Sequence, residues 1–159
     1  MENQKNIAKK KYPTLVYDQS DAVMTWVAER IPEVQGIGFE NAKGIGVLSP
    51  SGNLICGVVY DQYKPEFKTM QLTIAADHPQ WARKAIIHDL LAYPFIQLDI
   101  YKSWVAIPSD NEKSLKTVTH IGFVYDATLQ HQFGRNRHAI IGKMLKPDFE
   151  RMYGVSHES

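Results

Sequence analysis

The sequence lacks the residues and patterns that define several classes of protein. Its single cysteine, Cys56, excludes an internal disulfide and lies within an apolar strand pattern, so we expect a buried thiol rather than a nucleophile. No apolar run approaches the ~20 residues that a membrane helix requires. The first residues also lack the apolar segment of a secretion signal, which favours the cytoplasm. The formal net charge is only +1, so no overall basic field would attract nucleic acid.

Patterns of metal ligands are missing as well. None of the six histidines belongs to a His-x-x-x-His or Cys/His arrangement, so we expect no metal site. Four lysines near the start could form a nucleic-acid-binding arm, although a solvated terminal segment explains them more simply; they are Lys5, Lys9, Lys10 and Lys11. Residues 1–11 and 148–159 are expected to fray, because they show little periodicity.

Length and periodicity predict one domain of the α/β (α+β) class that spans residues 1–159. The chain has 159 residues, of which 44% are hydrophobic, and no linker or repeat interrupts it. Two β-rich runs, 45–48 and 54–60, flank a Pro/Gly/Asn turn and predict a hairpin. The other predicted elements are strands at 15–17, 70–75 and 104–107, a helix that ends before Pro32, helices at 81 to about 97 and at 109–122, and a closing pair of strands at 123–129 and 139–144.

The starts and ends of the last two helices carry specific signals. Pro94 should kink or end the first of them, because proline has no N–H to donate. Ser109 and Glu112 form a capping-box pattern at the start of the second, and Gly122 suits a left-handed C-terminal cap. The second helix therefore has the better defined boundaries.

The order of strand, polar turn and helix start between residues 70 and 84 predicts an anion-binding site. This order places free backbone N–H groups and the positive end of a helix dipole beside the carboxyl end of a strand. Arg83 and Lys84 in the first helical turn would add charge-assisted hydrogen bonds to a phosphate. Cations at this end of a helix oppose its dipole unless an anion is bound, although exposed basic residues on a turn are also common.

A longer segment resembles the GNAT (Gcn5-related) N-acetyltransferases. It reads Ile107-Pro108-Ser109-Asp110-Asn111-Glu112-Lys113-Ser114-Leu115 and is followed by His120-Ile121-Gly122-Phe123. In that family a strand leads to an Asn that opens a helix, a small residue follows three positions later, and a Gly-Phe ending leads into a hairpin. The resemblance covers residues 26–144, and two shorter segments, 81–83 and 92–95, are similar to small acetyltransferase-like proteins of phages and prophages.

The resemblance implies a mixed, mostly antiparallel central sheet, splayed at its middle and flanked by helices, with acetyl-CoA or another acyl-CoA in the cleft. On this basis the pantetheine arm would pair with Ile74, Ala75 and Ala76. The pyrophosphate would be held by Gln80, Trp81, Ala82, Arg83 and Lys84, and the thioester end would be lined by Asn111 and Ser114.

Two departures from the family pattern concern this cleft. The pyrophosphate loop usually contains glycines, whereas here the turn holds His78, Pro79 and Gln80 and has no glycine, which predicts a looser cradle or one with fewer amides. Many members also carry a tyrosine five residues before the Phe of the Gly-Phe ending, where it protonates the departing thiolate. Val118 occupies that position, so the usual general acid is missing.

Attack of a neutral amine on a thioester needs positioning, an oxyanion donor and a path for the proton, so the chemistry survives the loss of one acid. The candidates near the expected cleft are Tyr60, Asp61, Glu40, Asp77 and Ser114. Each also has a structural explanation: a core aromatic for Tyr60, loop or turn charges for the three acids, and a neutral helix position for Ser114.

The predicted function is an acyl-CoA-dependent N-acyltransferase, most simply an enzyme that transfers acetyl to an amine. The acceptor could be a small molecule, a protein or a nucleic acid, and a homodimer is compatible with this assignment. One alternative is a catalytically degenerate CoA-binding or interaction module. Another is a phage enzyme that modifies a nucleic-acid base in the host cytoplasm, supported by the basic residues of the last hairpin tip, His131, Arg135, Arg137 and His138.

Overall fold

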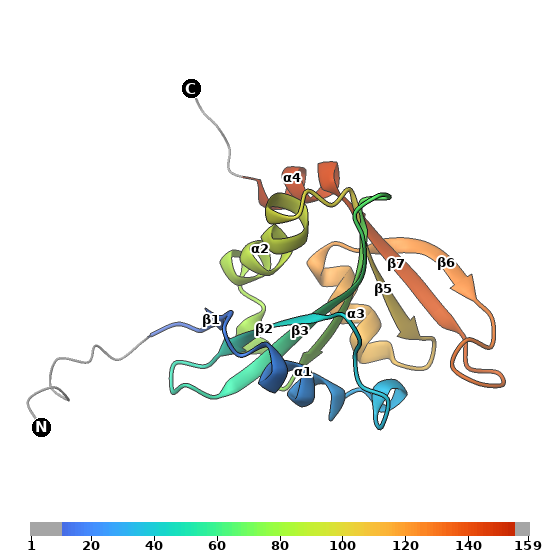
Figure 1. Cartoon of the computed structure of the whole chain (residues 1–159), viewed down its shortest axis with the longest axis horizontal. Coiled ribbons are helices and arrows are strands. Elements are labelled where there is room, and N and C mark those ends of the chain that lie inside the picture. Colours follow the sequence, from blue (N-terminus) through green and yellow to red (C-terminus); the bar gives the residue numbers. More distant parts are fainter. Residues whose placement is uncertain (1–10, 155–159) are drawn as a thin grey trace, which may run out of the picture.

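A seven-stranded sheet with the order β1-β2-β3-β4-β5-β7-β6 forms the centre of the molecule (Figure 1). In this computed structural model, which describes residues 11–154, the strands are β1 (Thr14–Val16), β2 (Lys43–Leu48), β3 (Leu54–Lys64), β4 (Thr69–Ala76), β5 (Lys102–Pro108), β6 (Val124–Leu129) and β7 (Ala139–Leu145). Each neighbouring pair is antiparallel except β4 and β5, which are parallel. The predicted mixed, mostly antiparallel α/β fold is confirmed.

The sheet opens between β4 and β5. The two strands pair only at one end, where Gln71 lies beside Trp104 in the last paired position. Beyond that point β3 stays paired with β4 as far as Ala76, and β7 stays paired with β5 as far as Pro108. The side of β4 that faces β5 therefore has no strand partner over residues 72–76, which confirms the predicted splay.

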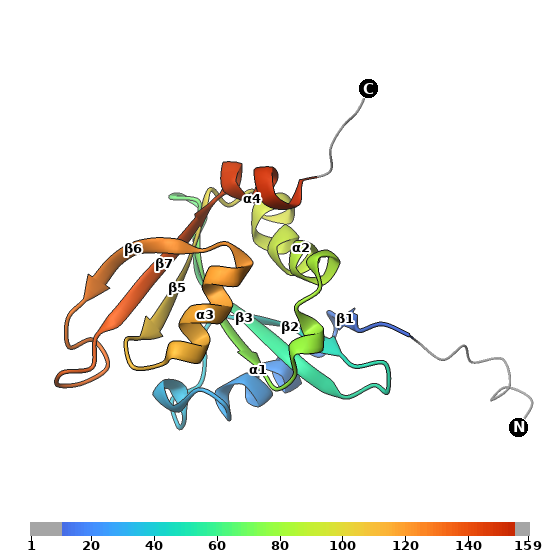
Figure 2. The ribbon, with the colours of Figure 1, turned by 180° about the vertical axis from the view of Figure 1, so that it is seen from behind.

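Helices cover the two faces unequally. Figure 1 looks onto the face that carries α1 (Ser20–Ala28), and Figure 2 looks onto the face that carries α2 (Lys84–Ala92) and α3 (Glu112–Ile121). Val23 and Val27 of α1 are fully buried against Val59 and Ala75. Close packing of α1 requires Gly57, because a Cβ there would lie 2.6 Å from Cγ2 of Val27. The larger core lies on the other face, beneath α2 and α3.

The predicted long helix at residues 81–97 is divided into three pieces. A 3-10 turn, Pro79–Trp81, precedes α2, and a π-helical turn, Tyr93–Gln97, follows it. Pro94 lies in the π turn, where the N–H of Leu98 donates to the carbonyl of Tyr93. The regular helix thus ends at Ala92, because proline cannot donate to the preceding turn.

The predicted capping box at Ser109 and Glu112 is wrong. Asn111 is the N-cap of α3, and its Oδ1 accepts a hydrogen bond from the N–H of Ser114 at 3.1 Å. Ser109 lies before the helix, and its N–H donates to the carbonyl of His138. The C-terminal prediction is confirmed, since Gly122 caps α3 with a φ of 123°.

The prediction that residues 148–159 fray also needs correction. Lys146–Tyr153 forms α4, and Phe149 of this helix is buried with its ring centroid 5.1 Å from that of Phe95. Pro147 occupies the first turn of α4, where its missing N–H costs nothing. Residues 155–159 and 1–10, including Lys5, Lys9 and Lys10, lie outside the described part of the chain.

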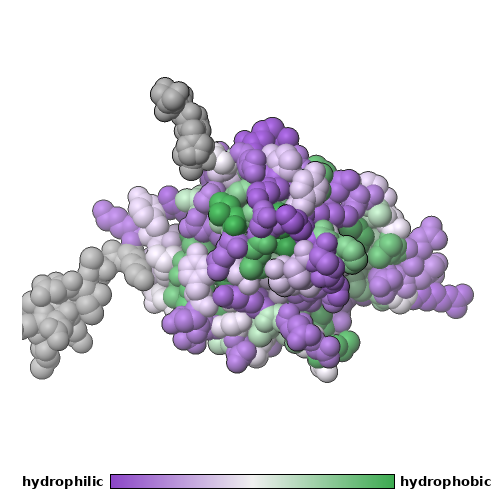
Figure 3. Space-filling model, turned by 45° about the horizontal axis from the view of Figure 1, so that its top comes forward, coloured by the Kyte–Doolittle hydropathy of each residue, from purple (hydrophilic) through white to green (hydrophobic). Residues whose placement is uncertain are grey.

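The surface around α2 and α4 is mostly hydrophilic. Figure 3 shows hydrophobic residues there in separate small patches rather than in one continuous area. None of the helices within residues 11–154 is long and apolar enough to cross a membrane.

Candidate functional site

A cleft of about 600 Å³ opens where β4 and β5 diverge. It is lined by elements from both faces of the sheet: the end of β4, the turn that follows β4, one side of α3, and the segment after α1 at residues 30–33. Seven of its lining residues belong to the predicted cofactor site, and they are Ile74, Ala75, Ala76, Trp81, Ala82, Asn111 and Ser114. The structure thus brings together most of the residues that the resemblance implied.

Three residues of the predicted pyrophosphate site do not line this cleft: Gln80, Arg83 and Lys84. The guanidinium of Arg83 lies over the ring of Tyr12, 4.2 Å from its centroid. In the glycine-free turn, Nδ1 of His78 accepts a hydrogen bond from the N–H of Gln80, so that amide already has a partner. The first turn of α2 has no side-chain cap, and its N–H groups remain suited to an anion.

The side of α3 that faces the cleft carries residues that the sequence interpretation missed. Lys113, Lys116, Thr117 and His120 line the cleft with the spacing of a single helical face. Because the apolar residues of α3 face the core, the polar face points into the open cleft. The positive charge that lines the cleft therefore comes from Lys113 and Lys116 of α3. It was predicted to come from Arg83 and Lys84, which do not line the cleft.

One ion pair borders the cleft where the segment after α1 meets the turn after β4. Nε and Nη2 of Arg30 each donate to a carboxylate oxygen of Asp77 at 2.9 Å, which keeps the pKa of Asp77 below its ordinary range. The Arg30 guanidinium also stacks on Trp26, 3.5 Å from the ring centroid. Asp77 is thus held in a bidentate pair, which makes it a poor candidate for a general base.

A second pair joins the last hairpin to this segment. Arg137 donates to both carboxylate oxygens of Asp110 at 3.1 Å and lies 3.5 Å from Glu33. The guanidinium keeps the pKa of Asp110 low. One of the basic residues in the predicted nucleic-acid contact is therefore already neutralised by acids of the same chain.

Comparison with solved structures identifies the architecture. A point mutant of the spermidine N-acetyltransferase SpeG from Vibrio cholerae superposes with a TM-score of 0.71 at 15% sequence identity, covering 88% of this chain and 97% of that one. The fold is that of the GNAT N-acetyltransferases. A chimera of SpeG and hSSAT gives a TM-score of 0.70 at 17% identity, with 89% and 99% of the two chains covered. A dodecameric spermidine N-acetyltransferase from the same organism gives 0.68 at 15% identity, with 88% and 97% covered. No family model and no curated protein matches the chain.

Within this GNAT fold the expected position of the general acid carries no proton donor. Val118 is buried and lines the cleft, as expected from its place before the Gly-Phe ending. Ser114 also lines the cleft, and its backbone N–H is held by Asn111. The hydroxyl of Ser114 is thus a predicted catalytic group that lies inside the candidate site.

Tyr60, another predicted catalytic residue, lies in the core of the GNAT fold. It is 1% exposed, and its hydroxyl donates to the carbonyl of Leu90 at 2.7 Å. Burial is the main cause that raises its pKa well above the ordinary value. Tyr60 is therefore explained by its alternative role as an aromatic residue of the core. Glu40, in the loop before β2, does not line the cleft.

Asp61 differs from the other candidates because it is half-buried and one of its carboxyl oxygens has no hydrogen-bond partner among residues 11–154. Its Oδ1 is enclosed and accepts no hydrogen bond from any residue of the described chain. Burial raises the pKa of this carboxyl from 3.8 to about 6. Asp61 does not line the cleft, but it lies directly opposite Gln71, which belongs to the last paired position of β4 and β5.

Replacing Asp61 by asparagine is expected to raise the melting temperature at pH 7.5. The folded-state pKa of about 6 exceeds the ordinary 3.8, so the folded protein holds this proton more tightly, and the carboxylate destabilises the fold above pH 6. After allowance for solvent screening, the gain should be about 1 kcal/mol, or roughly 2–4 °C. Thermal melts should show the gain disappearing below pH 4. An equal gain at both pH values would contradict the burial argument.

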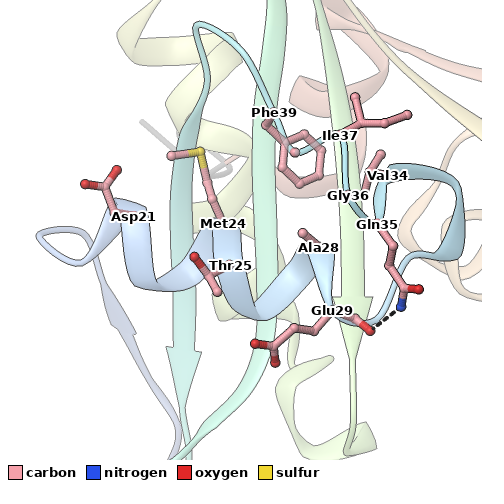
Figure 4. Close-up of a pocket in the computed structure, with 11 residues that line it drawn as sticks. Asp21, Met24, Thr25, Ala28, Glu29, Val34, Gln35, Gly36, Ile37 and Phe39 are labelled. Carbon is pink, nitrogen blue, oxygen red and sulfur yellow. Dashed lines mark hydrogen bonds between the residues drawn. The ribbon is translucent and has the colours of Figure 1, made fainter.

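A second hollow of about 660 Å³ lies on the outer side of α1 (Figure 4). Met24, Ala28 and Phe39 form its apolar wall, and the side-chain amide of Gln35 donates to the carbonyl of Glu29 beneath the loop. It has no basic lining residue and is separated from the splayed strands by α1. In residues 11–154 no group of three or more His, Cys, Asp or Glu side chains is placed to hold a metal ion.

Proposed function

We propose that this protein is an acyl-CoA-dependent N-acyltransferase, and most simply that it transfers acetyl to an amine. The observation that carries the proposal is the unpaired edge of β4 at residues 72–76, which opens into the cleft opposite the basic face of α3. The fold shared with spermidine N-acetyltransferases supports the same assignment.

The residues of the cleft fit acyl-CoA along its length. An extended chain with two amides, such as pantetheine, can add to the free edge of β4 as an extra strand. Ile74, Ala76, Ala82 and Ile107 supply apolar contacts beside that edge. Lys113 and Lys116 of α3, together with the uncapped start of α2, supply positive charge for the phosphates.

Bound acyl-CoA would supply an activated thioester carbonyl, to which the acceptor amine forms a C–N bond as the C–S bond breaks. Backbone N–H groups on the free edge of β4 would donate to the carbonyl oxygen as negative charge develops there. The hydroxyl of Ser114 lines the same space and could donate to the departing sulfur. Since Val118 cannot donate a proton, the thiolate otherwise leaves without a general acid; a thiolate is a much weaker base than an alkoxide and is therefore a fair leaving group.

The acceptor is an amine, and spermidine is the first one to test because the structural neighbours are spermidine N-acetyltransferases. Amine-bearing small molecules, lysine peptides and nucleic acid complete the panel. Release of free thiol from acetyl-CoA in the presence of each acceptor measures transfer.

Saturating acetyl-CoA is expected to stabilise the protein. At about 100 times the dissociation constant the gain is about 2.7 kcal/mol, which corresponds to a melting-temperature increase of roughly 5–11 °C for a domain of this size. Adenosine should give a much smaller increase, because it lacks the pantetheine arm and the phosphates. No shift with millimolar acetyl-CoA would overturn the proposed function.

A CoA-binding module without catalytic activity is the second candidate, and Val118 at the position of the usual acid favours it. The two candidates give different results in the same experiments. Thermal stabilisation by acetyl-CoA with thiol release for at least one amine supports the enzyme. Stabilisation without thiol release for any member of the panel supports the binding module.

A further inference from the structure

Asp61 lies on β3 beside the last paired position of β4 and β5, just before these two strands diverge. Residues that pair across strands point to the same face, so Asp61, Gln71 and Trp104 form a row on the face that carries α1. Gly57 and Val59, on the same side of β3, pack against α1 and fix this orientation. Since strands are spaced about 4.8 Å apart, Asp61 is roughly 10 Å from Trp104 across β4.

No helix of the described chain covers this row. In Figure 1, α1 lies in front of the first strands of the sheet, whereas β5, β7 and β6 have no helix in front of them. Gln71 and Trp104 are accordingly only half-buried, although they lie in the middle of a seven-stranded sheet. Asp61 is itself only partly buried, so a molecule on the α1 side can contact its carboxyl group.

Among the described residues no lysine or arginine forms an ion pair with Asp61, whereas Asp126 and Asp77 both have cationic partners. Lys102 on β5 and Lys143 on β7 both pair with Asp126 on β6, at 2.9 and 3.1 Å. Arg30 at the end of α1 pairs with Asp77. The remaining charged groups of α1 and the loop after it are acidic, namely Asp21, Glu29, Glu33 and Glu40, so these residues of the described chain supply no second cation.

We infer that Asp61 binds the ammonium group of the acceptor and accepts its proton, so that the acceptor is a cationic primary amine which approaches from the α1 side. This inference rests on the proposed function. The half-buried carboxylate gains its missing partner when the ammonium binds. It then takes one proton from the ammonium, directly or through a water, and the neutral amine forms the C–N bond to the acyl carbon. The second N–H proton leaves with the thiolate as free thiol, which balances the step.

The pKa of Asp61 suits both parts of this role. Burial holds it at about 6, so the group is ionised at pH 7.5 and yet is more basic than an ordinary aspartate. An alcohol carries no positive charge to offset the buried carboxylate, which is why the site favours an amine.

The test uses two CoA thioethers, because it then does not depend on the identity of the acceptor. S-(2-aminoethyl)-CoA carries an ammonium where the acceptor nitrogen would arrive, and S-propyl-CoA has the same shape without the charge. Calorimetry at pH 7.5 should show that the wild-type protein binds the aminoethyl compound about tenfold more tightly. Asp61→Asn should bind both compounds equally, with the affinity for the propyl compound unchanged.

Two further measurements control this result. Asp126→Asn removes a carboxylate of the same face and should keep the tenfold preference. The wild-type preference should also fall to about twofold at pH 5, where most Asp61 side chains are protonated, so the proposal can be tested without any variant. A preference that survives in Asp61→Asn, or its absence from the wild type when both compounds bind, overturns the role of Asp61 alone. Failure of both compounds and of CoA to bind overturns the proposed function itself.

Discussion

Reversing the charge on the cleft side of α3, with Lys113→Glu and Lys116→Glu together, should weaken CoA binding at least about 100-fold. Both residues line the cleft opposite the free edge of β4, where the phosphates would lie. Hydrogen bonds to charged groups contribute about 1.5–3 kcal/mol each, and a loss of roughly 3 kcal/mol corresponds to a 100-fold change in affinity. Calorimetric titration with CoA measures the effect directly.

A matched control variant distinguishes the loss of direct contacts with the phosphates from a change in the net charge of the protein. Lys64→Glu with Arg135→Glu changes the net charge by the same amount, and both residues are exposed and do not line the cleft. Because the Debye length is about 10 Å at 0.1 M salt, this variant should bind CoA nearly as well as the wild type. Equal weakening in the two variants would contradict a phosphate site on α3.

The same titration tests the interpretation made from sequence. If Arg83 and Lys84 hold the pyrophosphate, as the sequence suggests, Arg83→Ala with Lys84→Ala should weaken binding. The structure stacks Arg83 on Tyr12 and leaves both side chains outside the cleft lining. We therefore expect a smaller loss here than for the α3 variant, and a larger one would restore the sequence-based assignment.

The order of the elements was readable from sequence because periodicity reports which residues are buried. The hairpin of β2 and β3 followed from two β-rich runs on either side of a Pro/Gly/Asn turn, and the structure confirms it. The opening between β4 and β5 did not follow from periodicity, because Ile74 and Ile107 alternate in the same way whether or not their strands are paired. Only the resemblance to a family predicted it.

The functional residues were harder to read for a physical reason. Lys113 and Lys116 occupy the polar side of an amphipathic helix, and sequence cannot distinguish a side that faces a cleft from one that faces solvent. Asp61 stood among other candidates because its burial depends on which parts of the folded chain pack around it, and the sequence does not show them. Charge and desolvation at these positions are properties of the tertiary structure.

The packing of the C-terminal helix α4 on the core was also not predicted from the sequence. A short stripe of Phe149, Met152 and Tyr153 after a proline resembles a frayed end, yet α4 packs against α2 and against the end of α3. Phe149 stacks on Phe95 just beyond α2, and Met152 lies where a side chain on Gly122, at the end of α3, would stand.

Phe149→Ala is therefore expected to destabilise the protein by about 3–5 kcal/mol, as for other fully buried aromatic residues. Phe67→Ala is the matched control, because Phe67 is 72% exposed and its loss should change the free energy of unfolding by less than about 0.5 kcal/mol. Urea unfolding of both variants provides the measurement. If residues 146–153 were frayed, the two variants would be equally stable and a chain ending at Leu145 would unfold like the wild type. We expect that truncation to cost at least as much as Phe149→Ala, because it also removes the packing of Met152 at the end of α3.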